Sequence, residues 1–182
     1  FDKFVEYAFG INLNNRLFRE FKLHTNAVVF SESRARLLLQ LANAQGQAED
    51  TFRFIHFSVD AHSPEVYATI KGAPRGMQVR TNIERFLELR DALESPWPKV
   101  TLAFVVQPGN AHEAADFLAH WAPLLRDPEV SHDWPSTLVD TIYFRPLNCG
   151  DQVASDRLHA DTCRSLGMDV PEGDRIRAAE SF

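Results

Sequence analysis

The chain has 182 residues, 45% of them hydrophobic, and a formal net charge of -6. This length and composition suit one globular domain, and the interspersed acidic charge argues against nucleic-acid and anionic-membrane partners. No apolar run reaches the ~18 residues of a membrane span, and two cysteines, Cys149 and Cys163, make no disulfide framework. We therefore expect a cytoplasmic protein with reduced thiols.

The N-terminal part predicts a helix, a strand and a second helix. Apolar residues at spacings of three and four favour an amphipathic helix over residues 1–18. Residues 21–30, FKLHTNAVVF, are rich in aromatic and β-branched side chains and predict a strand with its exit loop. Ser31 or Ser33 can then cap the next helix.

Residues 53–65, RFIHFSVDAHSPE, carry the strongest local signal. The aromatic run predicts a buried strand, and Ser63 and Pro64 predict the N-cap and first residue of a helix. Ser58 and Asp60 lie two apart at the carboxyl end of that strand, where ligands bind in α/β folds. An equally good explanation is a strand-end turn in which Asp60 caps backbone groups.

The second half of the chain alternates helices and strands. The apolar residues within 79–94 recur along one stripe and predict a helix. Residues 100–107, VTLAFVVQ, predict a strand buried on both faces. Asn110 and Glu113 fit a capping box, which explains Asn110 better than a ligand contact does. After the helix that follows, the chain predicts a polar connection, a strand and a last helix at residues 127–136, 138–145 and 153–166.

Four strands that alternate with helices predict an α/β fold with a parallel sheet, either open or part of a barrel. We assign residues 1–150 to this unit and residues 151–182 to a C-terminal helix and tail. Standard motifs for dinucleotides, P-loop phosphates, zinc proteases and serine hydrolases are absent. His24 and His56 lie in strands and are better explained as core residues than as ligands, so no metal site is predicted.

Five segments add information through their order along the chain. They are TNA (25–27), SVDAHSPE (58–65), YATIKG (67–72), NIERFLELR (82–90) and FVVQPGNAHE (104–113). The ordered set resembles the second half of a radical S-adenosylmethionine (radical SAM) domain of the kind that carries a SPASM-type extension. The likeness covers roughly residues 1–145.

The resemblance implies a partial (β/α)6 TIM-like barrel, of which this chain would hold about the last four βα units. Such a barrel presents an iron-sulfur (4Fe-4S) cluster and S-adenosyl-L-methionine at the carboxyl ends of its strands. TNA would match the family's TNG motif, with Ala27 in place of glycine. The cofactor-binding residues implied by the resemblance are Thr25, Asn26, Ser58, Asp60, Gln107 and Asn110.

The chain also departs from the family pattern. It contains neither the CxxxCxxC motif that holds the cluster nor a GGE-like motif, and its two cysteines do not match an auxiliary cluster. Together with a first residue that is not methionine, this predicts a C-terminal segment of a larger protein. The chain alone is expected to hold neither the cluster nor the cofactor.

The expected function is therefore to supply cofactor-side and substrate-side walls for 5'-deoxyadenosyl radical chemistry on an unidentified peptide or small molecule. No catalytic residue is assigned. The alternative is a non-catalytic βα module that binds a ligand or a partner. One edge of the strand at residues 21–30 is expected to be open, so we also expect self-association unless the N-terminal helix covers that edge.

Overall fold

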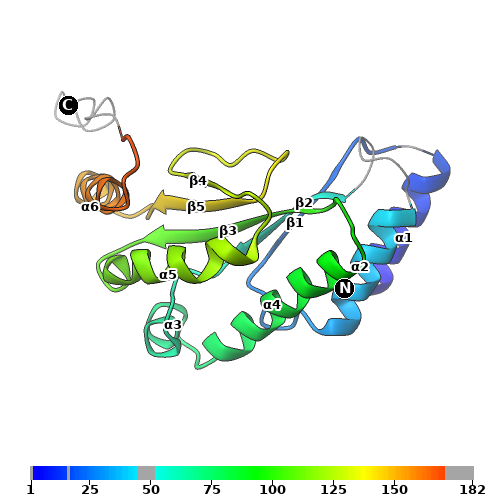
Figure 1. The fold of residues 1–182 in the computed structure, drawn as a ribbon, viewed down its shortest axis with the longest axis horizontal. Helices are drawn as coiled ribbons and strands as arrows, with labels where there is room; N and C mark the ends of the chain where they lie inside the picture. The colour runs from blue at the N-terminus through cyan, green and yellow to red at the C-terminus, as the bar shows by residue number, and fades with distance from the viewer. Residues whose placement is uncertain (1, 16, 45–51, 171–182) are drawn as a thin grey trace.

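The structure, a computed structural model, describes residues 2–15, 17–44 and 52–170. In chain order its elements are α1 (Asp2–Asn15), β1 (Phe21–Thr25), α2 (Glu32–Ala44), β2 (Phe52–Ser58), α3 (Pro64–Lys71), α4 (Gly76–Ala92), β3 (Lys99–Val106), η2 (Ala111–Glu113), α5 (Ala114–Trp121), η3 (Ala122–Leu124), β4 (Glu129–Ser131), β5 (Thr141–Pro146) and α6 (Gln152–Ser165) (Figure 1). The part of the predicted C-terminal tail that follows residue 170 lies outside the described residues.

The strands form one sheet in the order β1-β2-β3-β5-β4, and every neighbouring pair is parallel. The predicted α/β fold with a parallel sheet is confirmed. Within the described ranges the sheet has five strands rather than four, with β1 and β4 at its edges. The prediction missed β4 because its three residues lie in the polar connection and are too few to show a periodic pattern.

Several element ends differ from the prediction. The first helix ends at Asn15 rather than residue 18, and the Asn12 side chain accepts a hydrogen bond from the Phe18 backbone at 2.6 Å where the chain turns. The last strand begins at Thr141 rather than Leu138, which is 61% exposed. For both the end of α1 and the start of β5, apolar residues that lie just outside the element made the predicted hydrophobic pattern longer than the element itself.

The helix predicted at residues 79–94, α4, begins three residues earlier than expected. It starts at Gly76, where a side chain would bring a Cβ atom to 2.9 Å from the Cα of Pro64. Only glycine permits this close approach between α3 and α4. Leu93, which the pattern placed on the apolar stripe, lies after the helix and is 46% exposed.

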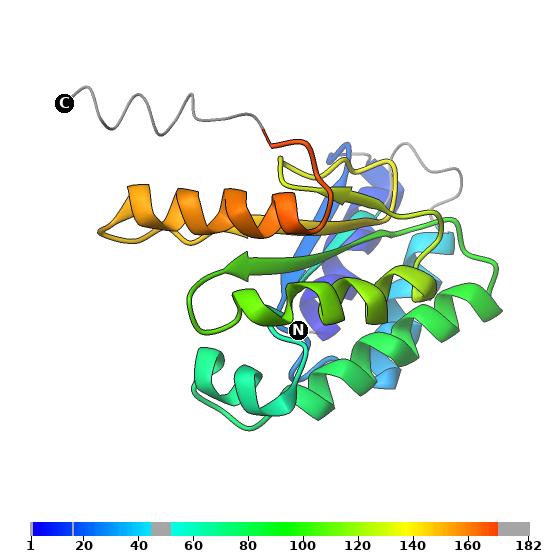
Figure 2. The same ribbon diagram turned by 60° about the vertical axis from the view of Figure 1, so that its left-hand side comes forward.

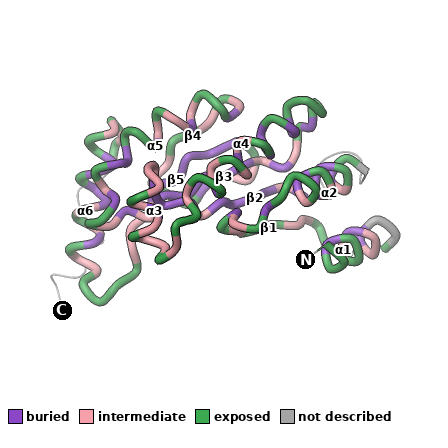
Figure 3. The backbone as a smooth tube through the Cα atoms, turned by 90° about the horizontal axis from the view of Figure 1, so that it is seen from below, coloured by how far each residue is buried: buried purple, intermediate pink, exposed green. Residues whose placement is uncertain are grey.

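One face of the sheet carries the apolar core. Ring contacts attach α4 to β2 through Phe86 and Phe57, and α5 to β3 through Phe117 and Phe104. Figure 3 shows the buried strands running between helices whose outer surfaces are exposed. These phenylalanines are fully buried, and each such side chain contributes about 1.5–3 kcal/mol of transfer free energy.

The opposite face of the inner strands is more polar. Strand register places His24 beside His56, His56 beside Thr101, and Thr101 beside Thr141. Two and four residues further along β5, Tyr143 and Arg145 share this side because side chains alternate along a strand. We call this surface the polar face and define it by Lys22, His24, His56, Ser58, Thr101, Thr141, Tyr143 and Arg145.

Candidate functional site

The predicted site residues follow three neighbouring strands. Thr25 and Ser58 are the last residues of β1 and β2, and Gln107 follows β3. Because the strands are parallel, these ends lie on the same edge of the sheet, which Figure 2 shows from a second direction. We call this the carboxyl edge.

Asp60 uses both carboxylate oxygens in contacts within the protein. Its Oδ1 accepts a hydrogen bond from the Val105 backbone N–H at 2.7 Å, while Oδ2 accepts one from Ser58 Oγ at 2.9 Å and pairs with the Lys71 ammonium group. Its backbone has a φ of +63°, which aspartate tolerates better than most residues. The buried carboxylate therefore ties β2 to β3 and to the end of α3.

Asn110 is fully buried and joins the same strand ends. Its Nδ2 donates to the backbone oxygens of Asp60 and Val105 at 2.7 and 2.9 Å, and its Oδ1 accepts from the Gln107 N–H at 2.9 Å. The Gln107 side chain, half-buried beside it, has no hydrogen-bond partner within the described part of the chain. Asn110 thus fixes the backbone, and Gln107 is left with free polar atoms.

The predicted capping box of Asn110 and Glu113 is wrong. Asn110 makes no side-chain cap bond, and the Glu113 carboxylate instead accepts from the backbone N–H groups of His62 and Ser63 at 2.8 and 3.1 Å. Burial raises the pKa of Glu113, but the hydrogen bonds from Ser63 and His62 outweigh it and leave this pKa lowered. Sequence spacing missed this contact because the partners are 50 residues apart.

Thr25 and Asn26 form a turn at the end of β1. Thr25 Oγ1 accepts from the Ala27 N–H at 3.1 Å, and Asn26 Oδ1 accepts from the Val28 N–H at 3.2 Å. Ala27 has a φ of +59°, and the Asn82 side chain on α4 donates to its carbonyl oxygen at 2.8 Å. The exposed Nδ2 of Asn26 remains available to a ligand.

Lys71 is the site residue that sequence reasoning missed. It is the last residue of α3, and its ammonium group donates to Ser58 Oγ at 3.2 Å as well as pairing with Asp60. A basic residue in the last turn of a helix is also a common helix-end signal, so its position alone did not single it out. Ser58, Asp60 and Lys71 thus form one polar cluster at the carboxyl edge.

A pair of histidines lies on the polar face beside this cluster. The rings of His24 and His56 stack with centroids 4.7 Å apart. Burial, followed by the neighbouring His24, lowers the pKa of His56 to about 4, so its ring is neutral near pH 7. His56 Nδ1 and the buried Thr101 Oγ1 have no hydrogen-bond partner among the residues that the structure describes.

The two cysteines occupy different environments. Cys149 is exposed, whereas Cys163 lies on the buried side of α6, in the core, and burial raises the pKa of its thiol to about 12. A thiol of this kind is protonated and unreactive at neutral pH. In residues 2–15, 17–44 and 52–170, no group of three or more His, Cys, Asp or Glu side chains could hold a metal ion.

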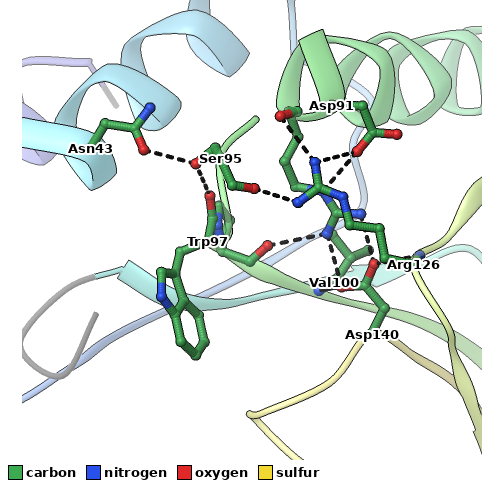
Figure 4. A network of polar contacts seen from close by, with 9 residues as sticks. Asn43, Asp91, Ser95, Trp97, Val100, Arg126 and Asp140 are labelled. Atoms are coloured by element: carbon green, nitrogen blue, oxygen red, sulfur yellow. Dashed lines mark hydrogen bonds and ion pairs between the residues drawn. The ribbon is translucent and has the colours of Figure 1, made fainter. Parts of the chain in front are cut away.

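At the opposite, amino end of the sheet, a second polar network surrounds Arg90 (Figure 4). The Arg90 guanidinium forms two bonds with Asp140, and Arg126 donates to the backbone oxygens of Arg90 and Ser95. Polar residues at this end of parallel strands serve stability rather than ligand binding. We therefore place the candidate site at the carboxyl edge.

Comparisons with known proteins do not assign this chain to a family. None of the helices described by the structure is both long and apolar enough to cross a bilayer. No protein-family model, curated protein or solved structure was found to match the chain.

Proposed function

We propose that this chain forms the C-terminal part of a radical SAM barrel and supplies cofactor-side and substrate-side walls. One observation carries the proposal: the segments at 25–27, 58–60 and 107–110 follow three adjacent parallel strands and so lie along one edge. Their order in the sequence is the order of β1, β2 and β3 in the sheet. Ligands of parallel α/β folds bind at this edge.

The turn after β1 supports the comparison with the TNG motif. Ala27 adopts a φ of +59°, the left-handed conformation that glycine reaches without a steric penalty. Alanine pays about 1–2 kcal/mol there. The bond from Asn82, which lies in another of the five ordered segments, stabilises the turn against that cost.

The residues of the carboxyl edge divide into two groups with respect to the cofactor. Asn26 and Gln107 have free side-chain polar atoms, and the half-buried Ser58 hydroxyl can accept a further bond, so these three would contact the cofactor. The side-chain polar atoms of Asp60 and Asn110 are hydrogen-bonded within the protein, so these two residues would hold the strand ends in place. S-adenosyl-L-methionine, bound together with the cluster of the parent protein, supplies the radical that abstracts a substrate hydrogen.

Calorimetry of S-adenosylmethionine binding to the intact parent protein tests the proposal. Ser58→Ala and Gln107→Ala should each weaken affinity roughly five- to tenfold, since one hydrogen bond contributes about 1 kcal/mol. Thr69→Ala, which removes an exposed hydroxyl on α3, is the control and should leave affinity unchanged. Unchanged affinity in both site variants, with lowered thermal stability, would contradict the proposal.

The internal bonding of Asp60 and Asn110 favours a second candidate, a non-catalytic βα module that binds a ligand or partner. The two candidates differ in the parent reading frame: the radical SAM proposal requires a CxxxCxxC motif preceding these residues. Anaerobic reconstitution of the chain alone should give no broad visible absorption, because two cysteines are too few to hold a 4Fe-4S cluster. A stable stoichiometric cluster in the isolated chain would refute the proposal that the cluster ligands lie outside this chain.

A further inference from the structure

Arg145 lies on the polar face, and its positive charge is not paired with any carboxylate that the structure describes. It lies near the carboxyl end of β5, opposite Val105 of β3, and it is half-buried. Its guanidinium has no ion pair or hydrogen bond with any residue that the structure describes. The nearby carboxylate of Asp60 is occupied by Lys71, Ser58 and the Val105 N–H. Arg145 is therefore not neutralised from within the described protein.

An unpaired, partly buried guanidinium is unusual because desolvation of a charge costs free energy that a partner normally offsets. Arginine also presents its N–H groups as a planar fork that matches a carboxylate. Burial and then His24 are the main causes of the lowered pKa of His56, and Arg145 adds a smaller contribution in the same direction, against an opposing one from Asp60. Arg145 and His56 lie on the polar face on strands on either side of β3, with Arg145 four residues nearer the carboxyl edge than the row of His56, Thr101 and Thr141.

A second observation on the same face also points to a ligand. His56 Nδ1 and Thr101 Oγ1 are buried without hydrogen-bond partners, and these residues are paired across β2 and β3. His56 is 8% exposed and Thr101 is 0% exposed. Buried polar atoms in native proteins are nearly always hydrogen-bonded. Arg145, His56 Nδ1 and Thr101 Oγ1 thus carry polar groups that make no hydrogen bond to the residues that the structure describes.

We propose that the polar face binds a carboxylate group of a small organic acid or amino acid, with Arg145 as its ion-pair partner and His56 and Thr101 in the adjoining polar wall. The inference deepens the proposed function, since in that setting the carboxylate belongs to the substrate, but binding itself needs neither cofactor nor cluster. The strand register places three cations on this face, Lys22, Lys99 and Arg145, against one carboxylate, Glu129 on the edge strand β4, so its charge favours an anion. The Asp60 carboxylate beside it is paired with Lys71.

The test is a titration of the 182-residue chain with succinate, followed through the NMR signals of the His56 ring and the Arg145 guanidinium. Succinamide, the neutral isostere, and inorganic phosphate are titrated in parallel. Succinate should bind with a millimolar Kd and shift both sets of signals, whereas succinamide should shift neither. Equal binding of phosphate would overturn the assignment to a carboxylate, and no response to succinate would overturn the site.

Arg145→Gln should weaken succinate binding by roughly tenfold or more, because the bidentate charge-assisted contact is lost. Arg157→Gln, on the exposed surface of α6, is the matched control and should bind as the parent chain does. Arg145→Lys keeps the charge without the fork, so it should lose affinity by a smaller factor and decides the matter if the glutamine variant does not fold. Unchanged affinity in the folded Arg145 variants would overturn the proposal. Failure of S-adenosylmethionine to bind the parent protein would instead refute only the proposed function.

Discussion

Arg90 and Asp140 face each other across the amino end of the sheet, with both N–O contacts of their ion pair at 2.7 to 2.8 Å. Each side chain is 1% exposed. Asp140 also accepts hydrogen bonds from the backbone N–H groups of Val100 and Arg126 (Figure 4). One carboxylate therefore connects α4, β3 and the segments on both sides of β4.

Asp140→Asn should destabilise the chain by about 3–5 kcal/mol, because it leaves the buried Arg90 charge with only a 3.8 Å contact to the half-exposed Asp91 carboxylate. Urea unfolding followed by circular dichroism measures the loss. Asp161→Asn removes the carboxylate of an exposed ion pair with Arg164 and should cost less than about 1 kcal/mol. Equal effects of the two substitutions would show that burial of the Arg90 pair adds nothing to its importance.

Glu113→Gln should cost about 1–3 kcal/mol at pH 7, because the charged acceptor of the His62 and Ser63 N–H groups becomes neutral. The Glu113 pKa is lowered in the folded state, so its ionised form stabilises the fold above the unfolded pKa, and this contribution is lost as the pH falls through the folded pKa. The stability difference between the two proteins should therefore shrink in acid. Glu65→Gln, at an exposed first-turn position of α3, is the control; a difference for Glu113→Gln that stays constant with pH would contradict the prediction.

Much of the fold was readable because the signals were local. Ser63 caps α3, as the sequence of that segment predicted, and Gly72 ends the helix with a φ of +70°. The site was harder to predict because its contacts join residues far apart in the chain. The 50-residue separation between Glu113 and Ser63 left the local capping-box pattern as the better explanation, and the bond from Asn82 to Ala27 spans 55 residues. Such contacts depend on the packing of helices on the sheet, which no periodic pattern encodes.

His56 should make the chain sensitive to mild acid. Its folded pKa is lowered to about 4, mainly by burial and then by His24, so the unfolded state binds more protons between that pH and the ordinary value of 6.5. Stability should fall as the pH drops through this range, by on the order of 3 kcal/mol at most. His56→Gln should flatten the decline measured by urea unfolding at a series of pH values. A decline of the same slope in His56→Gln would assign the effect to other groups.

The open edge of β1 should make the isolated chain self-associate. Within residues 2–15, 17–44 and 52–170, β2 is the single strand that pairs with β1. Helix α1 covers the β1 edge in part, where Phe9 stacks on Phe21 with ring centroids 4.4 Å apart. A groove of about 420 Å³ remains between α1 and β1, and its lining is mostly apolar and includes Phe4 and Phe18, which are 73% and 51% exposed. An unpaired strand edge beside exposed aromatic rings favours pairing with a second copy.

Light scattering should accordingly find dimers or larger species whose fraction rises with concentration. The double variant Phe4→Glu and Phe18→Glu should be monomeric, since it places charges in the groove at exposed positions where the cost to folding is small. Trp134→Glu, an equally exposed position between β4 and β5, is the control and should still associate. Hydrogen exchange gives an independent measure: in the monomeric variant the amides of residues 21–25 should be less protected than those of residues 99–106. A chain that is monomeric without substitution, with equal protection in both strands, would show that the β1 edge needs no partner and would count against the barrel-segment proposal.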